Sequence, residues 1–139
     1  MVVGRFHEAR FVRELVVPLF RDCSLVELAV ISLVAGIGEE MLFRGLIQGA
    51  AGRWIESPAV GLVLASVVFG LAHPLTRAYI VLAGVIGAYL GGLWLATDNL
   101  LAPIVAHALY DFLALVYLVR RNDSQESIPA GGPDSSALE

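Results

Sequence analysis

Long apolar stretches separated by short polar segments dominate the chain. Apolar residues fill four runs, over residues 25–51, 59–72, 79–96 and 100–119. A helix that crosses the hydrocarbon core of a bilayer needs about 20 mostly apolar residues. We therefore predict an all-α fold, a multi-pass transmembrane helical bundle with about four spanning helices. The second run is short, so flanking residues must complete that span.

The two ends of the chain differ from this apolar core. Residues 1–22 mix arginines with apolar residues, a pattern that predicts an N-terminal amphipathic or juxtamembrane helix at the membrane surface. Ser24 and Glu27 have the spacing of a capping box, so the first spanning helix should begin there. Residues 122–139 are rich in serine, glycine, proline and acidic residues, which predicts a disordered polar tail. Residues 23–121 form the predicted functional core.

Composition and charge support a membrane location. The chain is 58% apolar and has a mean hydropathy of +0.77, so it is more apolar than an ordinary soluble domain. All nine basic residues are arginines. Most of them flank the apolar core, and such flanks are typical of the cytoplasmic side of a membrane. With an even number of spans, the pattern predicts a cell-membrane protein with both termini in the cytoplasm, although Arg53 does not fit it.

The same composition excludes two other classes of site. No block of basic residues indicates nucleic-acid binding. Cys23 is the only cysteine, which excludes an internal disulfide and a metal site built from several cysteines.

Charged residues within the predicted spans indicate where the chemistry lies: Glu39, Glu40, Arg44 and Asp111. An aspartate or arginine near the centre of a spanning helix costs about 2.5–3.5 kcal/mol, so these groups should meet inside the bundle. Glu40 and Arg44 are four residues apart, on one helix face, and should form a mainly structural pair. Glu39 points about 100° away from Glu40 and is left free. We take Glu39 as the candidate general base that accepts a proton from water.

Two histidines extend this candidate site. Phe69 and His73 are four residues apart, as are His107 and Asp111, so each pair should share a helix face. Glu39, His73, His107 and Asp111 together could hold and activate a water. A histidine N–H could also stabilise the oxyanion of a tetrahedral intermediate.

Three motifs contain these residues: EEMLFRG at 39–45, FGLAH at 69–73 and PIVAHALYD at 103–111. They resemble the EExxxR, FxxxH and HxxxN patterns of the CPBP family of intramembrane proteases. That family includes the type II CAAX prenyl proteases and Abi-like, bacteriocin-processing proteins. The resemblance extends from about residue 26 to residue 119, the whole predicted membrane core.

The resemblance implies an intramembrane endopeptidase of the glutamate or metallo type. The position of Glu39 would activate the hydrolytic water with help from His73, while His107 and Asp111 would line the oxyanion side. Asp111 departs from the asparagine of the family pattern. A second carboxylate beside two histidines favours a metal, because Glu39, His73, His107 and Asp111 would suit zinc with an open water position. We therefore expect either no cofactor or a divalent metal, with zinc the first candidate.

The substrate and partners follow only from the resemblance. It implies a membrane-associated substrate, either a prenylated protein or a small peptide, in contact with membrane lipid. A second copy of the chain or a partner membrane subunit is left open, and nucleic acid is not expected. Two other classes of function stay open: a non-catalytic membrane protein of the same fold that acts in bacteriocin immunity or scaffolding, and an ion or proton carrier, since buried carboxylates and histidines also build proton relays.

Overall fold

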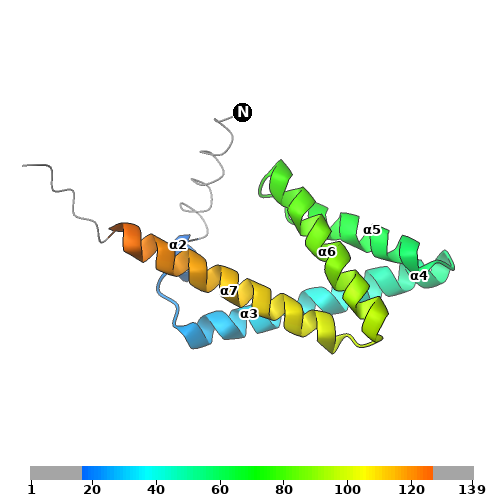
Figure 1. Cartoon of the computed structure of the whole chain (residues 1–139), viewed down its shortest axis with the longest axis horizontal. Coiled ribbons are helices and arrows are strands. Elements are labelled where there is room, and N and C mark those ends of the chain that lie inside the picture. The colour runs from blue at the N-terminus through cyan, green and yellow to red at the C-terminus, as the bar shows by residue number, and fades with distance from the viewer. Residues whose placement is uncertain (1–16, 127–139) are drawn as a thin grey trace, which may run out of the picture.

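The computed structural model describes residues 17–126, and every regular element in this part of the chain is a helix (Figure 1). The predicted all-α fold is confirmed. The elements are α2 (Val17–Phe20), α3 (Leu25–Glu40), the π-helix η2 (Met41–Gln48), α4 (Gly49–Trp54), α5 (Pro58–Leu71), α6 (Arg77–Thr97) and α7 (Leu101–Glu126).

Polar residues at the helix starts define several of these boundaries. The side chain of Ser24 accepts a hydrogen bond from the Glu27 N–H, and the Glu27 carboxylate accepts one from the Ser24 N–H at 2.8 Å. The predicted capping box at the start of α3 is therefore confirmed. The side chains of Ser57 and Thr76 cap α5 and α6, each by accepting a hydrogen bond from a backbone N–H of the first turn. These side chains satisfy N–H groups that the first helical turn leaves without a partner.

The first predicted span is a helix of mixed type. α3, η2 and α4 follow one another without a break from residue 25 to residue 54. Phe43 and Gln48 are both buried although they are five residues apart, a spacing that places side chains about 140° apart on an α-helix. In a π-helix the hydrogen bonds join residues five apart, so both side chains face the bundle. The sequence predicted a helix over residues 25–51, and the structure has one there; the change of helix type was not predicted, because an apolar run does not reveal it.

Close backbone contacts hold the helices together. Figure 1 shows α3 beside α7 and α5 beside α6, while α6 and α7 diverge from the turn that joins them. A Cβ atom on Gly70 of α5 would lie 2.6 Å from the Ile80 carbonyl oxygen of α6. A Cβ on Gly36 of α3 would lie 3.1 Å from the Ala108 Cβ of α7. Small residues thus permit the close approach that helix pairs use in lipid.

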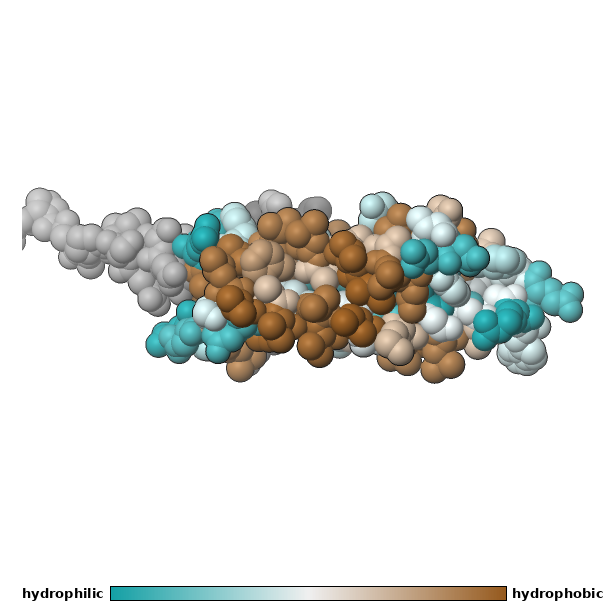
Figure 2. Space-filling model, turned by 90° about the horizontal axis from the view of Figure 1, so that it is seen from below, coloured by the Kyte–Doolittle hydropathy of each residue, from teal (hydrophilic) through white to brown (hydrophobic). Residues whose placement is uncertain are grey.

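The surface of the described residues carries a broad apolar band between polar ends (Figure 2). Two helices of this part are long and apolar enough to cross a membrane, Arg77–Thr97 and Leu101–Arg121. α5 has only 14 residues, or about 21 Å of helix, less than the roughly 30 Å of a hydrocarbon core. The predicted total of four spans therefore stays a prediction.

The structure bears on the two predicted flanking segments only in part. Residues 1–16 of the predicted amphipathic segment and residues 127–139 of the predicted tail lie outside the described residues. α2 forms the end of the first segment, with Val17 buried. α7 continues to Glu126, past residue 122, where the polar tail was predicted to begin.

Candidate active site

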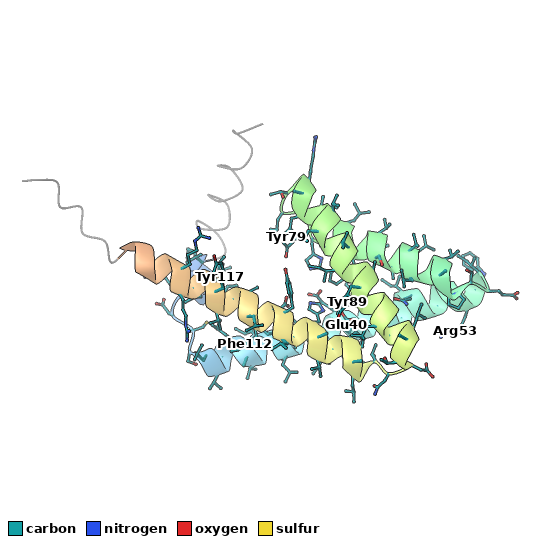
Figure 3. All side chains as sticks on the ribbon, in the orientation of Figure 1. Glu40, Arg53, Tyr79, Tyr89, Phe112 and Tyr117 are labelled. Atoms are coloured by element: carbon teal, nitrogen blue, oxygen red, sulfur yellow. The ribbon has the colours of Figure 1, made fainter. Side chains whose placement is uncertain are left out.

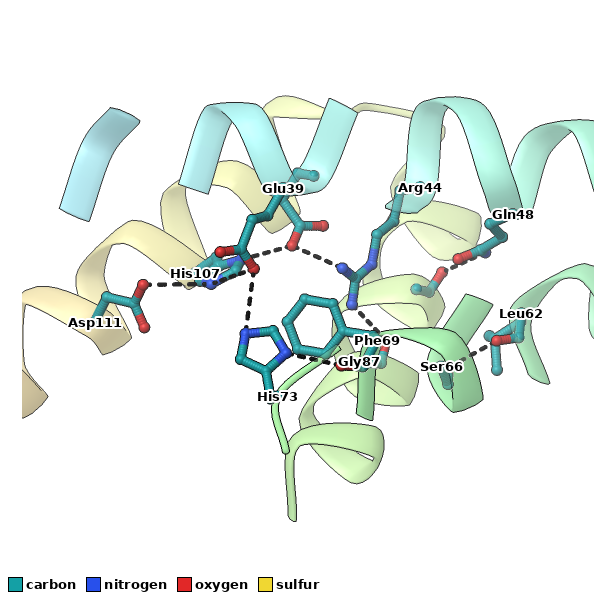
Figure 4. Close-up of polar contacts among 12 residues, drawn as sticks. Glu39, Arg44, Gln48, Leu62, Ser66, Phe69, His73, Gly87, His107 and Asp111 are labelled. Carbon is teal, nitrogen blue, oxygen red and sulfur yellow. Dashed lines mark hydrogen bonds and ion pairs between the residues drawn. The ribbon is translucent and has the colours of Figure 1, made fainter. Parts of the chain in front are cut away.

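Three parts of the fold bring the predicted site residues together (Figure 4). The end of α3 and the start of η2 provide Glu39, Glu40 and Arg44. The turn between α5 and α6 provides His73, and α7 provides His107 with Asp111. All of these side chains meet in one cluster. They are separated by up to 72 residues in the sequence, between Glu39 and Asp111 (111 − 39).

Glu40 lies at the buried centre of this cluster. Its side chain is fully buried, and Oε1 accepts a hydrogen bond from Arg44 Nη1 at 2.9 Å. The same oxygen accepts a second hydrogen bond from His107 Nδ1 at 2.7 Å. The pair with Arg44 follows the predicted spacing of four residues. The contact with His107 was not predicted, because helix periodicity reveals only neighbours on the same helix. Glu40 therefore orients a histidine of the site as well as neutralising an arginine.

Arg44 ties the cluster to α6. Its Nη2 donates to the carbonyl oxygen of Gly87 at 2.8 Å, and its guanidinium lies 4.7 Å from the centre of the Phe69 ring. One turn further on, Gln48 Nε2 donates to the carbonyl oxygen of Gly91 at 3.2 Å. Both acceptors are backbone carbonyl groups of glycines, and the missing side chains let Arg44 and Gln48 approach them. Gln48 was not singled out from the sequence, although a glutamine inside an apolar run was the available signal.

Glu39 is the more accessible of the two glutamates. Its Oε2 atom lies 3.6 Å from His73 Nε2 and 3.9 Å from His107 Nε2. Oε2 is itself buried and has no hydrogen-bond partner among the described residues. These separations are too long for direct hydrogen bonds, but a bridging water could contact all three groups. The carboxylate is thus positioned to act on a small molecule between the helices.

The hydrogen bonds of the two histidines fix which ring nitrogen carries a proton. His73 Nδ1 lies 2.7 Å from the carbonyl oxygen of Phe69, which can only accept, so Nδ1 is the donor. His107 Nδ1 donates to Glu40 in the same way. The neutral imidazole of His73 therefore presents an unprotonated Nε2 toward Glu39, while His107 Nε2 lies between Glu39 and Asp111. The histidine N–H groups predicted as oxyanion donors are, at Nδ1, already engaged in these two bonds.

Phe69 is the aromatic centre of the site. It is 3% exposed, and its ring centre lies 4.5 Å from that of His73 and 5.8 Å from that of His107. It also meets Phe43 edge to face at 4.8 Å. His73 lies beyond the last residue of α5, so the two residues do not share a regular helix face as predicted. The hydrogen bond from His73 to the Phe69 carbonyl still keeps the two rings together.

Asp111 lies at the outer side of His107. Its Oδ2 atom is 3.4 Å from His107 Nε2. Among residues 17–126, no group of three or more histidine, cysteine, aspartate or glutamate side chains has an arrangement that could hold a metal ion. The side chains predicted as zinc ligands, Glu39, His73, His107 and Asp111, therefore do not fit a metal site as they lie here. No step proposed below depends on a metal.

Tyr79 is a neighbour of the site that sequence analysis missed. Its ring centre lies 6.3 Å from that of His73, and the ring packs against the buried cluster of Phe43, Phe69 and Ala83. Figure 3 shows its side chain directed from the start of α6 toward α7. Tyr79 opens an apolar run, and the polar end of its ring was the only signal in the sequence.

The fold and the site together define a helical membrane protein with a buried centre of glutamates and histidines. The family model Rce1-like, described as type II CAAX prenyl endopeptidase Rce1-like, matches residues 21–113. The chain belongs to this family of membrane proteases, which confirms the predicted CPBP resemblance. No curated protein and no solved structure matches the chain.

Proposed function

We propose that the protein is an intramembrane endopeptidase in which Glu39 activates the water that cleaves the peptide bond. The observation that carries this proposal is the position of Glu39 Oε2. This oxygen is buried, has no hydrogen-bond partner among the described residues, and faces His73 Nε2 at 3.6 Å and His107 Nε2 at 3.9 Å. A buried polar atom without a partner is costly, and a catalytic role or an ordered water can account for it. Glu40 Oε2 is also buried without a partner, so what distinguishes Glu39 Oε2 is that it faces two imidazole nitrogens.

The reaction needs one base and one acid, and Glu39 can serve as both in turn. Glu39 takes a proton from water, and the oxygen of that water forms a bond to the carbonyl carbon of the substrate. The C=O electron pair moves to oxygen and gives a tetrahedral oxyanion. When the oxyanion collapses, the C–N bond breaks and the amine leaves with the proton that Glu39 held. The products are a carboxylic acid and an amine, and Glu39 is again ionised.

His73 would position the water rather than take its proton first. Its Nδ1 hydrogen is held by the Phe69 carbonyl, so Nε2 can accept a hydrogen bond from the water while Glu39 accepts the other. The ring is also fixed by its contact with Phe69. A water held at two points has its oxygen lone pair free to face the substrate.

The charge of the cluster supports a role in proton transfer. Within the part of the site that the structure describes, three carboxyl groups, Glu39, Glu40 and Asp111, surround His107 and one guanidinium. An excess of negative charge in a low-dielectric interior is costly, so the cluster favours keeping a proton taken from water. The Glu40–Arg44 ion pair keeps its charges throughout the reaction, whereas the charge of Glu39 changes as it gains and loses a proton.

The proposed substrate is a membrane-associated polypeptide that is prenylated or otherwise apolar near its cleavage site. The family description supports this choice, because it names CAAX prenyl endopeptidases. The apolar band on the surface would let such a substrate reach the site from the lipid (Figure 2). We further propose that the chain spans the membrane several times with both termini in the cytoplasm, as the arginine-rich flanks indicate.

Cleavage of a synthetic peptide by the purified protein in lipid vesicles tests the function. A farnesylated peptide with a C-terminal CAAX sequence is the first probe, and an unmodified apolar peptide is the second. Wild-type protein should release a product whose mass shows hydrolysis of one peptide bond, and Glu39→Gln should not. Glu56→Gln is the matched control, because Glu56 is exposed and lies in the turn after α4. Equal cleavage by wild type and Glu39→Gln would refute the proposal.

A further inference from the structure

The proposed site contains many hydrogen-bond acceptors and few free donors. Glu39 and Asp111 are carboxylates, which accept only when ionised. The Nδ1 hydrogens of His73 and His107 are used by the Phe69 carbonyl and by Glu40. Asp111 also replaces the amide donor that an asparagine would provide at this position. Hydrogen-bond donors aimed at the developing oxyanion accelerate peptide hydrolysis, so a nearby hydroxyl group would add a donor that the carboxylates lack.

Tyr79 carries a hydroxyl group in the right neighbourhood. Its ring lies 6.3 Å from the His73 ring, centre to centre, at an interplanar angle of 55°. Its side chain is directed toward α7, the helix that carries His107 and Asp111 (Figure 3). A tyrosine hydroxyl can donate one hydrogen bond, and among neutral side chains it is a strong donor. The ring contact with His73 and this direction together place the hydroxyl end of Tyr79 at the polar cluster.

The position of Tyr79 is fixed by the same helix contacts that hold the site. Tyr79, Ala83, Gly87 and Gly91 follow one another at intervals of four residues along one face of α6. The last three are buried, and the carbonyls of Gly87 and Gly91 accept from Arg44 and Gln48. At the other end of this face, Thr76 Oγ1 accepts from the Tyr79 N–H at 3.0 Å. A row of small residues packed against η2 thus ends in a tyrosine at the polar cluster.

We propose that the Tyr79 hydroxyl donates a hydrogen bond to the carbonyl oxygen of the scissile peptide and stabilises it as it becomes an oxyanion. Tyr79 keeps its proton throughout, so no bond of the tyrosine forms or breaks. This inference rests on the proposed peptidase function. It gives this chain an oxyanion donor in place of the asparagine that Asp111 replaces.

Substitution of Tyr79 by phenylalanine tests the inference. Tyr79→Phe keeps the ring that packs against Phe43 and Phe69 and removes only the hydroxyl. We expect kcat for the vesicle-bound peptide to fall about 100-fold, the usual effect of losing one oxyanion donor, with KM within about twofold of wild type. Tyr89→Phe is the matched control, because Tyr89 is on the same helix and 65% exposed; it should keep full activity. Unchanged kcat in Tyr79→Phe, or a change in KM alone, would overturn the inference.

A second measurement tests the inference even if Tyr79→Phe is less stable than wild type. A phosphinate analogue of the cleaved peptide carries a tetrahedral centre with an anionic oxygen, so it mimics the oxyanion. Its affinity for folded protein in vesicles should fall about 100-fold in Tyr79→Phe and stay unchanged in Tyr89→Phe. Equal affinity in both variants contradicts the role of Tyr79. Activity that survives Glu39→Gln instead contradicts the peptidase mechanism itself, so the two failures are distinguishable.

Discussion

The carboxylate of Glu40 accepts a hydrogen bond from His107 Nδ1 at 2.7 Å, and these two residues join the α3–η2 boundary to α7. The same oxygen also holds Arg44. Glu40 is therefore a positioning residue: it fixes the protonated nitrogen of His107 and leaves Nε2 facing Glu39 and Asp111. The adjacent glutamates have separate tasks, since Glu40 bonds to Arg44 and His107 through Oε1, whereas Glu39 Oε2 faces two imidazole nitrogens without bonding directly to either.

Replacement of Glu40 should affect stability more than replacement of Glu39. Glu40→Ala leaves the buried Arg44 without its carboxylate, and breaking a buried ion pair in this way costs about 3–5 kcal/mol. We expect a marked fall in Tm for Glu40→Ala, measured in detergent micelles. Glu39→Gln should keep nearly the wild-type Tm, because the Glu39 side chain is 34% exposed and its Oε2 bonds to no described residue. Equal Tm losses in the two variants would contradict this division of tasks.

Asp111→Asn should retain activity or increase it. The asparagine amide can donate a hydrogen bond to an oxyanion, which the ionised carboxylate cannot. The amide keeps the size of the side chain and the contact distance to His107 Nε2, 3.4 Å in the present structure. The measurement is kcat/KM for the vesicle-bound peptide. Complete loss of cleavage in Asp111→Asn would mean that the reaction requires the negative charge at this position.

Two glycines of the α5–α6 region should respond in opposite ways to alanine. A Cβ on Gly70 would lie 2.6 Å from the Ile80 carbonyl oxygen, a backbone atom that cannot turn aside. Gly70→Ala should therefore destabilise the protein by about 1–3 kcal/mol, as overpacking does elsewhere. A Cβ on Gly92 would meet nothing within 4 Å, so Gly92→Ala should be neutral or raise stability by up to about 1 kcal/mol. Thermal unfolding of both variants checks the pair.

Removal of divalent metals should leave the activity intact. The described residues offer no arrangement of three or more ligand side chains for a metal ion, and the proposed reaction needs only Glu39, the histidines and water. Activity should persist after incubation with EDTA and with 1,10-phenanthroline at concentrations that strip zinc proteins. Loss of cleavage that added Zn²⁺ restores would show that a metal takes part.

Much of this site could be predicted from the sequence because its signals are strong. Glutamates and histidines within apolar runs are too costly to face lipid, so their presence indicated a shared interior. The spacing of Glu40 and Arg44 predicted their pair, and the short motifs indicated the family. These inferences need only the composition of each run and the geometry of a regular helix.

The remaining features depend on tertiary contacts that periodicity does not reveal. The bond from His107 to Glu40 joins residues 67 positions apart. The π-helical turn at η2 changes which residues face the bundle, and a uniform apolar run gives no sign of it. Tyr79 reaches the site only because the turn after α5 reverses the chain beside His73. In the sequence, Tyr79 looks like any tyrosine that lies at a membrane interface near the start of a helix. Its place beside the site emerges only from the fold.

The most direct test of the central claim is the single-turnover rate of peptide cleavage by Glu39→Gln in vesicles, measured beside its Tm. The glutamine has nearly the same shape but cannot take a proton from water, so loss of this general base should lower the rate at least about 10²–10⁴-fold. The Tm should stay close to that of wild type. A rate within a few-fold of wild type would contradict the claim that Glu39, held between His73 and His107, activates the water.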